Sequence, residues 1–459
     1  MIKNIDNANF LARMQDLLKD DFDNYVSSIS APSKKGLRVN TLKISVPDYL
    51  KLNPFKLSPV PSIDVGFFYE DDSSIGTHPY HHAGLYYSQE PASMMPVNAL
   101  SKLGDFSGEL ALDLCSAPGG KSTQLAALVG ESGLVVSNEI VPKRAQILRG
   151  NVERLGLKNV VVTCTNIPAF CKNFVNLAKL VVVDAPCSGE GMFRKNDKAI
   201  LEWNVDSVKT NAVRQTEILE CAYTTLKPNG YMVYSTCTFS LEEDESVVTD
   251  FLSRHNDMEL VAIDKSIESI SKTIGTYNGV DVTPCRRFYP QDNVGEGQFL
   301  VVFKKLGEEP TEIKCNFRLA DTSGNESILA KKFLKETLGH TDFTLGKLGG
   351  VVFILPERKV GINKLPVLSV GVDLGEYDKG VFKPHHHFFM AYGDKVKNKL
   401  DMPVSDIRVS KFLRGESIED DSISDGYVAI LVDGYPLGFG KAKGGVIKNH
   451  YPKGIRNLT

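Results

Sequence analysis

The stretch that decides the fold is GELALDLCSAPGGKSTQLAALVGESGLVVSNEIV, residues 108–141. LALDLC is a continuous apolar run, as expected for a strand buried on both faces of a sheet. SAPGGK is a tight turn whose glycines let a ligand approach the backbone, and KSTQLAALV opens a helix whose free N–H groups favour a negative or polar ligand. LVVSN predicts a second strand, so the stretch indicates a strand, a ligand loop, a helix and another strand.

The acid after the second predicted strand indicates the kind of ligand. Glu139 follows Gly119 by 20 residues, the separation at which an acid binds ribose hydroxyls in doubly wound nucleotide folds. The glycines are adjacent, whereas a Walker loop needs four residues between its first glycine and its Gly-Lys pair, so an NTPase is disfavoured. A nucleoside cofactor fits, and S-adenosylmethionine fits as well as a dinucleotide does. The alternative is a glycine turn that only packs a helix on a strand.

Outward from this stretch, strands and helices alternate from about Gly84 to Lys305, which predicts a parallel sheet covered by helices on both faces. Before it we expect a helix from Phe10 to Lys19 and a strand in GLRVNTLKI. After it, GEEPTE at 307–312 resembles a linker, VVFILP resembles a strand, and the last block is rich in short strands and glycine turns. The predicted domains are a small N-terminal α/β domain at 1–80, an α/β core at 81–305, a linking domain at 306–385 and a β-rich domain at 386–459.

Composition limits the class of protein. The chain has 459 residues, 42% apolar and 24% charged, with a net charge of −3, which is typical of a globular protein with no global basic character. Its eight cysteines form no CxxC pair, so a zinc ribbon is not indicated. Scattered cysteines in a chain of this length are typical of reduced thiols in the cytosol. The start is too polar for a signal peptide, and no run approaches the ~18 apolar residues of a membrane span. We therefore expect a cytoplasmic protein with no membrane partner. HHH at 385–387 has no acidic or cysteine partner nearby, so we expect no metal.

Two cysteines follow predicted strands. VVVDAPCSGEG delivers Asp184 and Cys187, and YSTCTFS delivers Cys237 just before a helix expected to start around Ser240 with acids in its first turn. Ligands of open α/β sheets bind outside the carboxyl ends of strands, so these residues should meet the glycine loop at one edge. A single buried cysteine is usually an apolar filler. Two at this edge, one near a helix start that lowers thiol pKa, favour chemistry.

A thiolate, a carboxylic acid and a methyl donor suit one reaction. Carbon 5 of a pyrimidine is a poor nucleophile until a thiolate adds to carbon 6 and makes the ring enamine-like. An acid near ring nitrogen 3 stabilises that species, and a second base-like group helps remove the carbon 5 proton before the thiolate leaves. Two cysteines and one aspartate could supply these roles. An exocyclic-amine methyltransferase would need no nucleophile and usually has Asn or Asp before Pro-Pro, where this chain has DAPC.

The three motifs DLCSAPGGK, DAPCSGEG and YSTCTFS, in this order, resemble those of RNA cytosine-5 methyltransferases of the Nop/Sun type. DAPCSGEGMFRKN and YYSQEPASMMPV are most similar to the bacterial RsmF branch, which modifies 16S ribosomal RNA. The resemblance covers at least residues 36–303, and the NHYPKGIR ending is similar to the branch's PUA-like RNA-binding domain. It implies a doubly wound Rossmann-like methyltransferase core, S-adenosylmethionine as cofactor, and a role in rRNA processing and ribosome biogenesis.

The resemblance also assigns roles to residues. The nucleophile would be Cys237, Cys187 would assist product release, and Asp184 would contact the cytosine. The residues implied at the cofactor are Cys115, Ser116, Ala117, Pro118, Gly119, Gly120, Lys121, Glu139, Arg144, Asn166 and Asp184. The sequence departs from the family pattern in two respects. Asn166 stands where many relatives have an adenine-binding Asp. Gln298 stands where relatives often have His, and Gln291 is a similar departure.

The expected partner is 16S rRNA or the small ribosomal subunit, bound by a monomer. Residues 436–459 carry five cations and no acid, which suits a phosphate backbone, although a solvated basic rim is the alternative. The expected RNA contacts are Arg38, Lys441, Lys448, Lys453 and Arg456. Other functions remain open: the same reaction on tRNA or another rRNA site, or a catalytically silent rRNA-binding assembly factor, for which the paired thiols would have no use.

Overall fold

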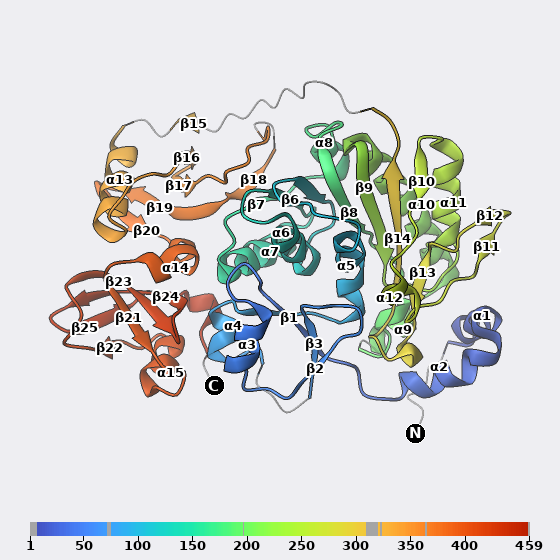
Figure 1. Cartoon of the computed structure of the whole chain (residues 1–459), viewed down its shortest axis with the longest axis horizontal. Coiled ribbons are helices and arrows are strands. Elements are labelled where there is room, and N and C mark those ends of the chain that lie inside the picture. The colour runs from blue at the N-terminus through green and yellow to red at the C-terminus, as the bar shows by residue number, and fades with distance from the viewer. Residues whose placement is uncertain are drawn as a thin grey trace.

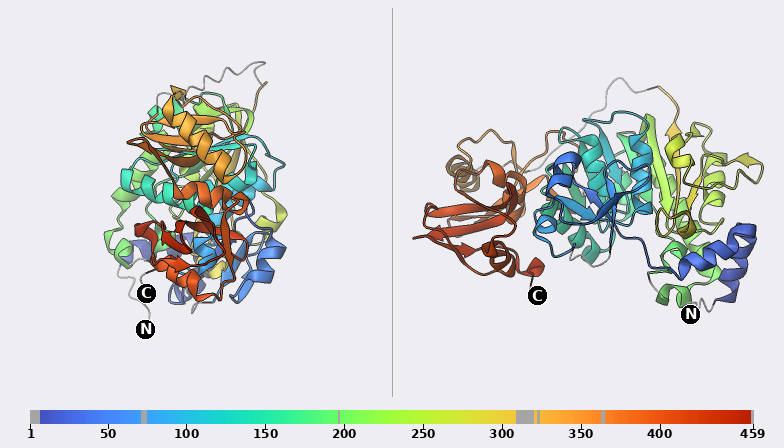
Figure 2. Two further views of the ribbon diagram at one scale, coloured as in Figure 1. Left: turned by 90° about the vertical axis from the view of Figure 1, so that its left-hand side faces the viewer. Right: turned by 60° about the horizontal axis from the view of Figure 1, so that its bottom comes forward.

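The structure is a computed structural model that describes residues 7–70, 75–195, 197–308, 320–321, 324–362 and 365–457. Its largest sheet occupies the middle of the molecule (Figure 1). A four-stranded sheet lies beside the central nine-stranded sheet, and two five-stranded sheets follow toward the C-terminal end. Helices α1 (Ala8–Leu18) and α2 (Phe22–Ile29) lie at the opposite end, as Figure 2 shows. No helix within the described ranges is both long and apolar enough to cross a membrane.

The central sheet has the order β10-β14-β9-β8-β5-β6-β7-β18, and β13 also pairs with β14. The five strands from β9 to β7 are parallel, and those at the two edges are antiparallel. This arrangement confirms the doubly wound α/β fold expected from the sequence. The strands are β5 (Leu110–Asp113), β6 (Leu134–Asn138), β7 (Val160–Thr163), β8 (Ala178–Asp184), β9 (Leu226–Thr236), β10 (Met258–Leu260), β13 (Arg286–Phe288), β14 (Gln298–Lys305) and β18 (Val367–Val370).

Helices cover both faces of this sheet, which explains the continuous apolar runs of its strands. Ala111 and Val135 pack with the helices of one face, whereas Leu112 and Val136 pack with those of the other. Burial of each such Leu or Val side chain contributes about 1.5–3 kcal/mol. The first face is covered by α5 (Met95–Ser101), α6 (Gly120–Val129) and α7 (Pro142–Leu155), and the second by α8 (Ile167–Cys171), α10 (Val205–Thr225) and α11 (Glu245–Arg254).

The chain order creates a switch point between β5 and β8. From β5 the chain adds β6 and β7 on one side, and then returns to add β8 and β9 on the other. Loops that leave the carboxyl ends of β5 and β8 therefore diverge and open a crevice between them, where ligands of such folds bind. The glycine loop follows β5, and Asp184 ends β8. The fold thus places both halves of the expected site at one crevice.

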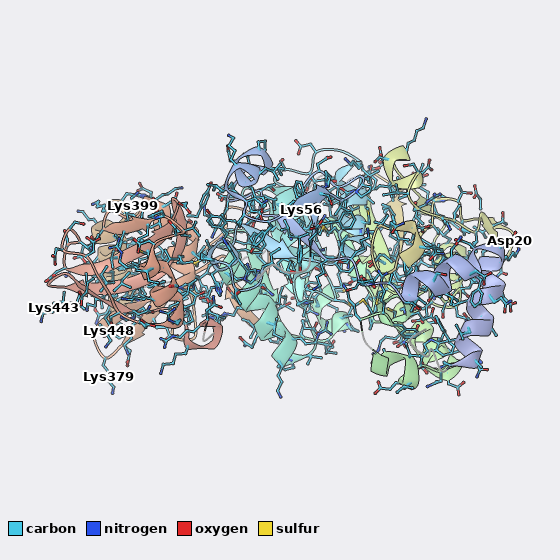
Figure 3. All side chains as sticks on the ribbon, turned by 90° about the horizontal axis from the view of Figure 1, so that it is seen from below. Asp20, Lys56, Lys379, Lys399, Lys443 and Lys448 are labelled. Atoms are coloured by element: carbon cyan, nitrogen blue, oxygen red, sulfur yellow. The ribbon has the colours of Figure 1, made fainter. Side chains whose placement is uncertain are left out.

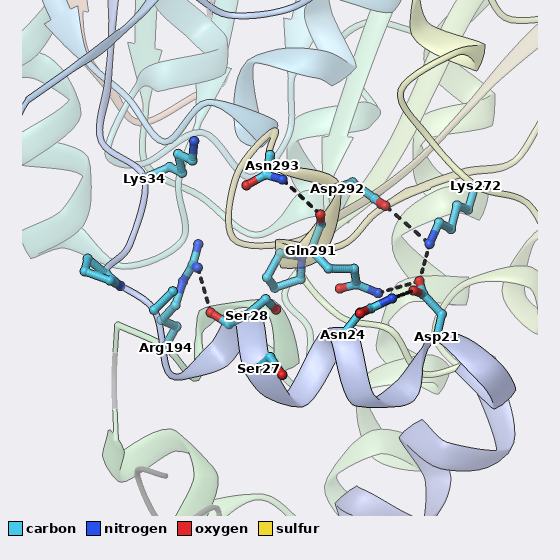
Figure 4. Close-up of a pocket in the computed structure, with 13 residues that line it drawn as sticks. Asp21, Asn24, Ser27, Ser28, Lys34, Arg194, Lys272, Gln291, Asp292 and Asn293 are labelled. Atoms are coloured by element: carbon cyan, nitrogen blue, oxygen red, sulfur yellow. Dashed lines mark hydrogen bonds and ion pairs between the residues drawn. The ribbon is translucent and has the colours of Figure 1, made fainter. Parts of the chain in front are cut away.

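The N-terminal helices pack against the core. Phe10 and Tyr25 join Phe193, Trp203 and Phe239 in one buried aromatic cluster. A polar pocket of about 460 Å³ separates α2 from the turn η4 (Pro290–Asp292) (Figure 4). Polar contacts join its walls: Lys272 pairs with Asp21 and Asp292, Gln291 donates to Asp21 over 3.0 Å, and Arg194 donates to the Ser28 carbonyl over 3.0 Å.

A small antiparallel sheet of order β2-β3-β1-β4 follows these helices. The strand expected over GLRVNTLKI is shorter than predicted. It corresponds to β1, which ends at Val39 because residues 41–43 form a turn. The elements of this region are β1 (Gly36–Val39), α3 (Val46–Leu52), β2 (Leu57–Pro59), β3 (Gly66–Tyr69), α4 (Pro79–His82) and β4 (Tyr86–Ser88).

Two five-stranded sheets form the C-terminal part. The first has the order β15-β16-β17-β19-β20 beside helix α13, which the sequence did not predict, and the second has the order β21-β23-β24-β25-β22. The expected linker at 307–312 lies mostly outside the described residues. The elements are β15 (Ala320–Asp321), α13 (Asn325–Thr337), β16 (Leu345–Leu348), β17 (Val351–Ile354), β19 (Val372–Asp378), β20 (Val381–Pro384), α14 (His386–Tyr392), β21 (Lys399–Met402), α15 (Ile407–Arg414), β22 (Ile418–Glu419), β23 (Gly426–Val432), β24 (Tyr435–Lys443) and β25 (Val446–Asn449).

Candidate active site

The glycine loop between β5 and α6 is fixed by buried hydrogen bonds. Ser122 Oγ donates to Asp113 Oδ2 over 2.6 Å, and Ser116 Oγ donates to the Asp113 carbonyl over 2.7 Å. Gly119 has a φ of +115°, a backbone conformation that residues other than glycine rarely adopt. A Cβ atom there would also lie 3.0 Å from Leu148 Cδ1. The loop therefore holds a set shape that depends on its first glycine.

Glu139 stands at the carboxyl end of β6, as predicted. Its side chain is only 3% exposed, Oε1 accepts from the Val141 N–H over 2.9 Å, and Oε2 lies 3.5 Å from Arg144 Nη1. Arg144 Nη2 donates to the Ala117 carbonyl over 2.7 Å, which ties α7 to the glycine loop. An acid held at the second strand end has the position that suits ribose hydroxyls.

One cavity of about 580 Å³ collects most of the predicted residues. Its walls join the cofactor loop, the ends of β6, β7 and β8, and the face of α10. The predicted residues that line it are Cys115, Ala117, Glu139, Arg144, Asn166, Asp184, Cys187 and Cys237. Apolar side chains and one buried acid beside a glycine loop fit a nucleoside cofactor. Ser116, Pro118, Gly119, Gly120 and Lys121 lie in the loop behind this lining.

Asp184 links the two halves of the site. Its Oδ2 lies 2.8 Å from Lys121 Nζ, and its Oδ1 accepts from Ser235 Oγ over 2.8 Å. Lys121 begins α6 and is 9% exposed, whereas the Asp184 side chain is 34% exposed and lines the cavity. The carboxylate is therefore oriented from two sides while one edge stays open to a ligand.

The two predicted thiols are in contact. Cys187 Sγ lies 3.3 Å from Cys237 Sγ and also accepts from the Cys237 N–H over 3.3 Å. The hydrogen bond to Cys237 and burial raise the pKa of Cys187 well above its ordinary value, and either sulfur can donate to the other. The loops after β8 and β9 thus present a sulfur pair to the cavity.

The helix expected just after Cys237 begins later than predicted. α11 starts at Glu245, because Asp244 and Glu245 turn inward to pair with the buried Arg287 instead of occupying an exposed first turn. The stretch between Thr238 and Asp244 is a loop. Cys237 therefore does not lie at a helix N-terminus, and its setting comes from Cys187 and the cavity.

Arg38 contradicts the expectation that it contacts RNA. The side chain is buried, and its guanidinium donates to Gln89 Oε1 over 3.0 Å and to Thr123 Oγ1 over 2.6 Å. Burial lowers its pKa to about 10. It joins the small sheet to α6 and has no free edge for phosphate. Arg38 stands between apolar residues in a strand-like run, and that pattern gave no sign that its side chain would be buried.

The C-terminal cations lie on the surface. Lys441 and Lys448 are directly opposite each other on β24 and β25, and both are exposed. Figure 3 shows Lys443 and Lys448 on this sheet at one end of the molecule. Lys453 is exposed, whereas Arg456 is half-buried and donates to the Tyr451 carbonyl. The RNA contacts of these residues stay a prediction.

Asn166 and α10 show what the sequence could and could not reveal. Asn166 lines the cavity and caps α8, since its Oδ1 accepts from the Ala169 N–H over 2.9 Å. The α10 side chains Arg214, Glu217 and Cys221 also line the cavity and were not predicted. They lie on one helical face three and four residues apart, but nothing in the sequence places that face at the site. Cys221 thus also borders the ligand space.

The remaining candidates are structural. Gln298 is buried on β14, and Gln291 lies in the pocket beneath α2, so neither borders the active cavity. His386 and His387 are buried between sheets. Across the described part of the chain, no group of three or more His, Cys, Asp or Glu side chains is placed to hold a metal ion.

A doubly wound sheet with a glycine loop, a strand-end acid and two thiols around one crevice defines a Rossmann-like methyltransferase. Comparison with known proteins agrees. The family described as "16S rRNA methyltransferase RsmB/F" matches residues 102–304 of the chain. The family of RsmF N-terminal domains matches residues 7–91, and that of RsmF PUA domains matches residues 399–457. Ribosomal RNA small subunit methyltransferase F of Vibrio vulnificus (strain YJ016) is 32% identical over 97% of this chain and 96% of its own. That of Enterobacter sp. (strain 638) is 30% identical over 97% and 94%.

The chain therefore belongs to the family of ribosomal RNA small subunit methyltransferase F, which confirms the resemblance seen in its motifs. A methyltransferase homologue from Pyrococcus horikoshii is 31% identical, with a TM-score of 0.57 over 65% of this chain and 94% of that one. The structure titled NSun6 from Pyrococcus horikoshii with SFG is 20% identical, with a TM-score of 0.54 over 66% and 98%, and supports the fold alone.

Proposed function

We propose that the chain transfers a methyl group from S-adenosylmethionine to carbon 5 of a cytidine in 16S rRNA of the small ribosomal subunit, through a covalent bond between cysteine and cytosine. The observation that carries this proposal is the contact of Cys187 and Cys237, 3.3 Å apart, in the cavity that also contains Glu139 and Asp184. A binding module would need neither thiol. The relatives named above supply the ribosomal RNA as substrate class.

Cys237 is the nucleophile. Its thiolate sulfur adds to carbon 6 of the cytosine, the ring electrons move to carbon 5, and carbon 5 takes the methyl group as the bond from that group to the cofactor sulfur breaks. Asp184, held by Lys121 and Ser235, would face nitrogen 3 and pass it the proton that stabilises the ring as charge builds up. Glu139 binds the ribose of the cofactor, whose chemistry is to supply the methyl group, while Asn166 lines the cavity beside it.

Cys187 assists release. The carbon 5 proton must leave, and the carbon–sulfur bond must then break to restore the double bond between carbons 5 and 6. The largest cause of the raised pKa of Cys187 is its hydrogen bond to Cys237. Once the Cys237 sulfur is attached to the base, Cys187 lies beside the adduct and can take part in passing on the carbon 5 proton.

The test is transfer of labelled methyl groups to 16S RNA and to small subunits, with denaturing gels to detect protein–RNA adducts. Cys237→Ala should transfer nothing and form no adduct, whereas Cys187→Ala should accumulate one. Cys285→Ala is the control, because that buried cysteine lies outside the cavity. An adduct trapped by Cys237→Ala instead would exchange the two roles. Transfer to tRNA alone would move the substrate, and no transfer to any RNA would favour a silent assembly factor.

A further inference from the structure

Two buried polar side chains bracket Cys187 without entering the cavity. Gln215 on α10 and Glu243, in the loop before α11, have fully buried side chains. Gln215 Nε2 donates to the Pro186 carbonyl over 2.9 Å, and Glu243 Oε2 accepts from the Ser188 N–H over 3.0 Å. The backbone is therefore held on both sides of the cysteine.

The two side chains act as one unit. Gln215 Nε2 also donates to Glu243 Oε2 over 2.8 Å, so one amide bridges the carboxylate and the Pro186 carbonyl. The unit reaches the second cysteine loop as well, because the hydroxyls of Ser188 and Thr238 lie 2.7 Å apart. Displacement of either side chain would therefore move Cys187 relative to Cys237.

A second carboxylate ties the same two loops in the opposite direction. Glu190, after Cys187 in the chain, accepts from the Phe239 N–H over 2.8 Å and from Ser240 Oγ. The Gly191 N–H donates to the Cys237 carbonyl over 2.8 Å. Glu190 holds the loops beyond the two cysteines, whereas Gln215 and Glu243 hold the backbone directly on either side of Cys187.

Keeping a carboxylate in this position has an energetic cost. Burial raises the pKa of Glu243 to about 7, against the opposing effect of its hydrogen bonds from Ser188 and Gln215. A buried acid is costly compared with an apolar residue of similar size, unless its geometry is needed. Neither Glu243 nor Gln215 lines the cavity, so neither touches a ligand there.

We propose that Glu243 and Gln215 are positioning residues that hold Cys187 against Cys237 for release of the methylated product. The inference rests on the proposed function, because it assumes that Cys187 acts in release. Glu243→Gln leaves one acceptor oxygen for the Ser188 and Gln215 donors and places an NH2 group against the Ser188 N–H and Thr238 Oγ1, where Glu243 has its second acceptor oxygen. Gln215→Leu removes both donated hydrogen bonds at similar volume. Each change should leave nucleophilic attack in place and slow the step that needs Cys187, since misplacement by about 1 Å can cost roughly 100-fold.

The experiment compares single turnovers of the full chain on 16S RNA with labelled S-adenosylmethionine, followed on denaturing gels. Wild type, Cys187→Ala, Glu243→Gln and Gln215→Leu are run together. Glu242→Gln is the matched control, since Glu242 pairs with Arg13 on the outside of the same loop. We expect Glu243→Gln and Gln215→Leu to accumulate adduct as Cys187→Ala does, with at least a tenfold slower release and an unchanged KM for the cofactor.

Each other outcome has a definite reading. If Cys187→Ala traps no adduct, the role given to Cys187 in the proposed function is wrong. If Cys187→Ala traps adduct but both positioning variants release product at the wild-type rate, the inference is overturned. Loss of cofactor affinity and of adduct in both variants, with lowered melting temperatures, would assign the pair a purely structural role and also overturn it. If Glu243→Gln alone fails to fold, Gln215→Leu decides.

Discussion

Lys121 Nζ lies 2.8 Å from Asp184 Oδ2. This ion pair joins the first turn of α6, just after the glycine loop, to the end of β8, where the proposed chemistry takes place. Asp184 Oδ1 accepts from Ser235 Oγ, so the carboxylate is held by a cation on one side and a hydroxyl on the other. Lys121 itself does not line the cavity. Its contribution is therefore the orientation of Asp184, which the cavity exposes.

Lys121→Met should reduce kcat more than it raises the KM for the cofactor. The change removes the cation and leaves the Asp184 carboxylate partnered only by Ser235. Because Asp184 is about one-third exposed, water screens part of the loss, and we expect roughly 1.4–2.8 kcal/mol, a fall of about 10- to 100-fold in kcat/KM. Steady-state kinetics on 16S RNA measure this. Lys102→Met, which removes a surface pair with Asp64, should leave kcat within about twofold.

Gly119→Ala should distort the cofactor loop. A φ of +115° costs a residue with a side chain about 1–3 kcal/mol, and the added methyl group would meet Leu148. Cofactor affinity, measured by calorimetry, should fall at least roughly tenfold. Gly150→Ala is the matched control, because Gly150 lies in α7 with open space around it and should gain about 0.5–1 kcal/mol of stability. Equal affinity in both variants would contradict the role of Gly119.

Two buried histidines, His82 and His387, lie where the C-terminal region packs on the rest of the chain. The stability of the folded protein should therefore depend on pH in the acid range. His82 Nδ1 lies 2.7 Å from the Tyr451 hydroxyl, and burial lowers the pKa of His82 and of His387 from 6.5 to about 4. The folded state thus favours the neutral rings, whereas the unfolded chain binds protons below about pH 6.5. The stability that these rings contribute is present above pH 6.5 and is lost as the pH falls to about 4. Urea midpoints measured from pH 7.5 to 4.5 should fall across this window.

Replacement of the histidines tests the origin of this slope. His82→Gln and His387→Gln should lower stability at pH 7.5, because each ring makes buried hydrogen bonds. Between pH 6.5 and 4.5, however, the variants should lose stability less steeply than wild type. A slope identical to that of wild type would place the pH dependence elsewhere.

Lys441 and Lys448 should contribute to RNA affinity through phosphate contacts. They are opposite each other on β24 and β25 and exposed, so both can approach one backbone. The double change of both lysines to Gln should weaken binding of 16S RNA and reduce the slope of log K against log salt concentration by roughly one to two. Filter binding from 50 to 300 mM salt measures this. Lys56→Gln, which breaks a surface pair with Glu70, should leave the slope unchanged.

Much of the central fold could be predicted from sequence. The apolar runs that became β5, β6, β8 and β9 are local patterns, and strands buried on both faces leave that pattern in any sequence. The positions of Glu139, Asp184, Cys187 and Cys237 at strand ends followed from the same runs. The start of α11 was missed because Asp244 and Glu245 resemble a solvated first turn, but pair with Arg287, more than 40 residues further along the chain.

By itself the sequence determined the doubly wound core, the glycine loop and the motifs of the family, because these depend on patterns within a few residues. Only the tertiary structure decided which side chains share a space. It buried Arg38 against α6, turned Arg214 and Cys221 into the cavity, and set Glu243 and Gln215 around Cys187. A strand-end residue is placed by its own strand, whereas a helix face or a buried hydrogen bond is placed by partners distant in the chain. That is the physical reason why the strand-end residues could be placed from sequence and the residues that support them could not.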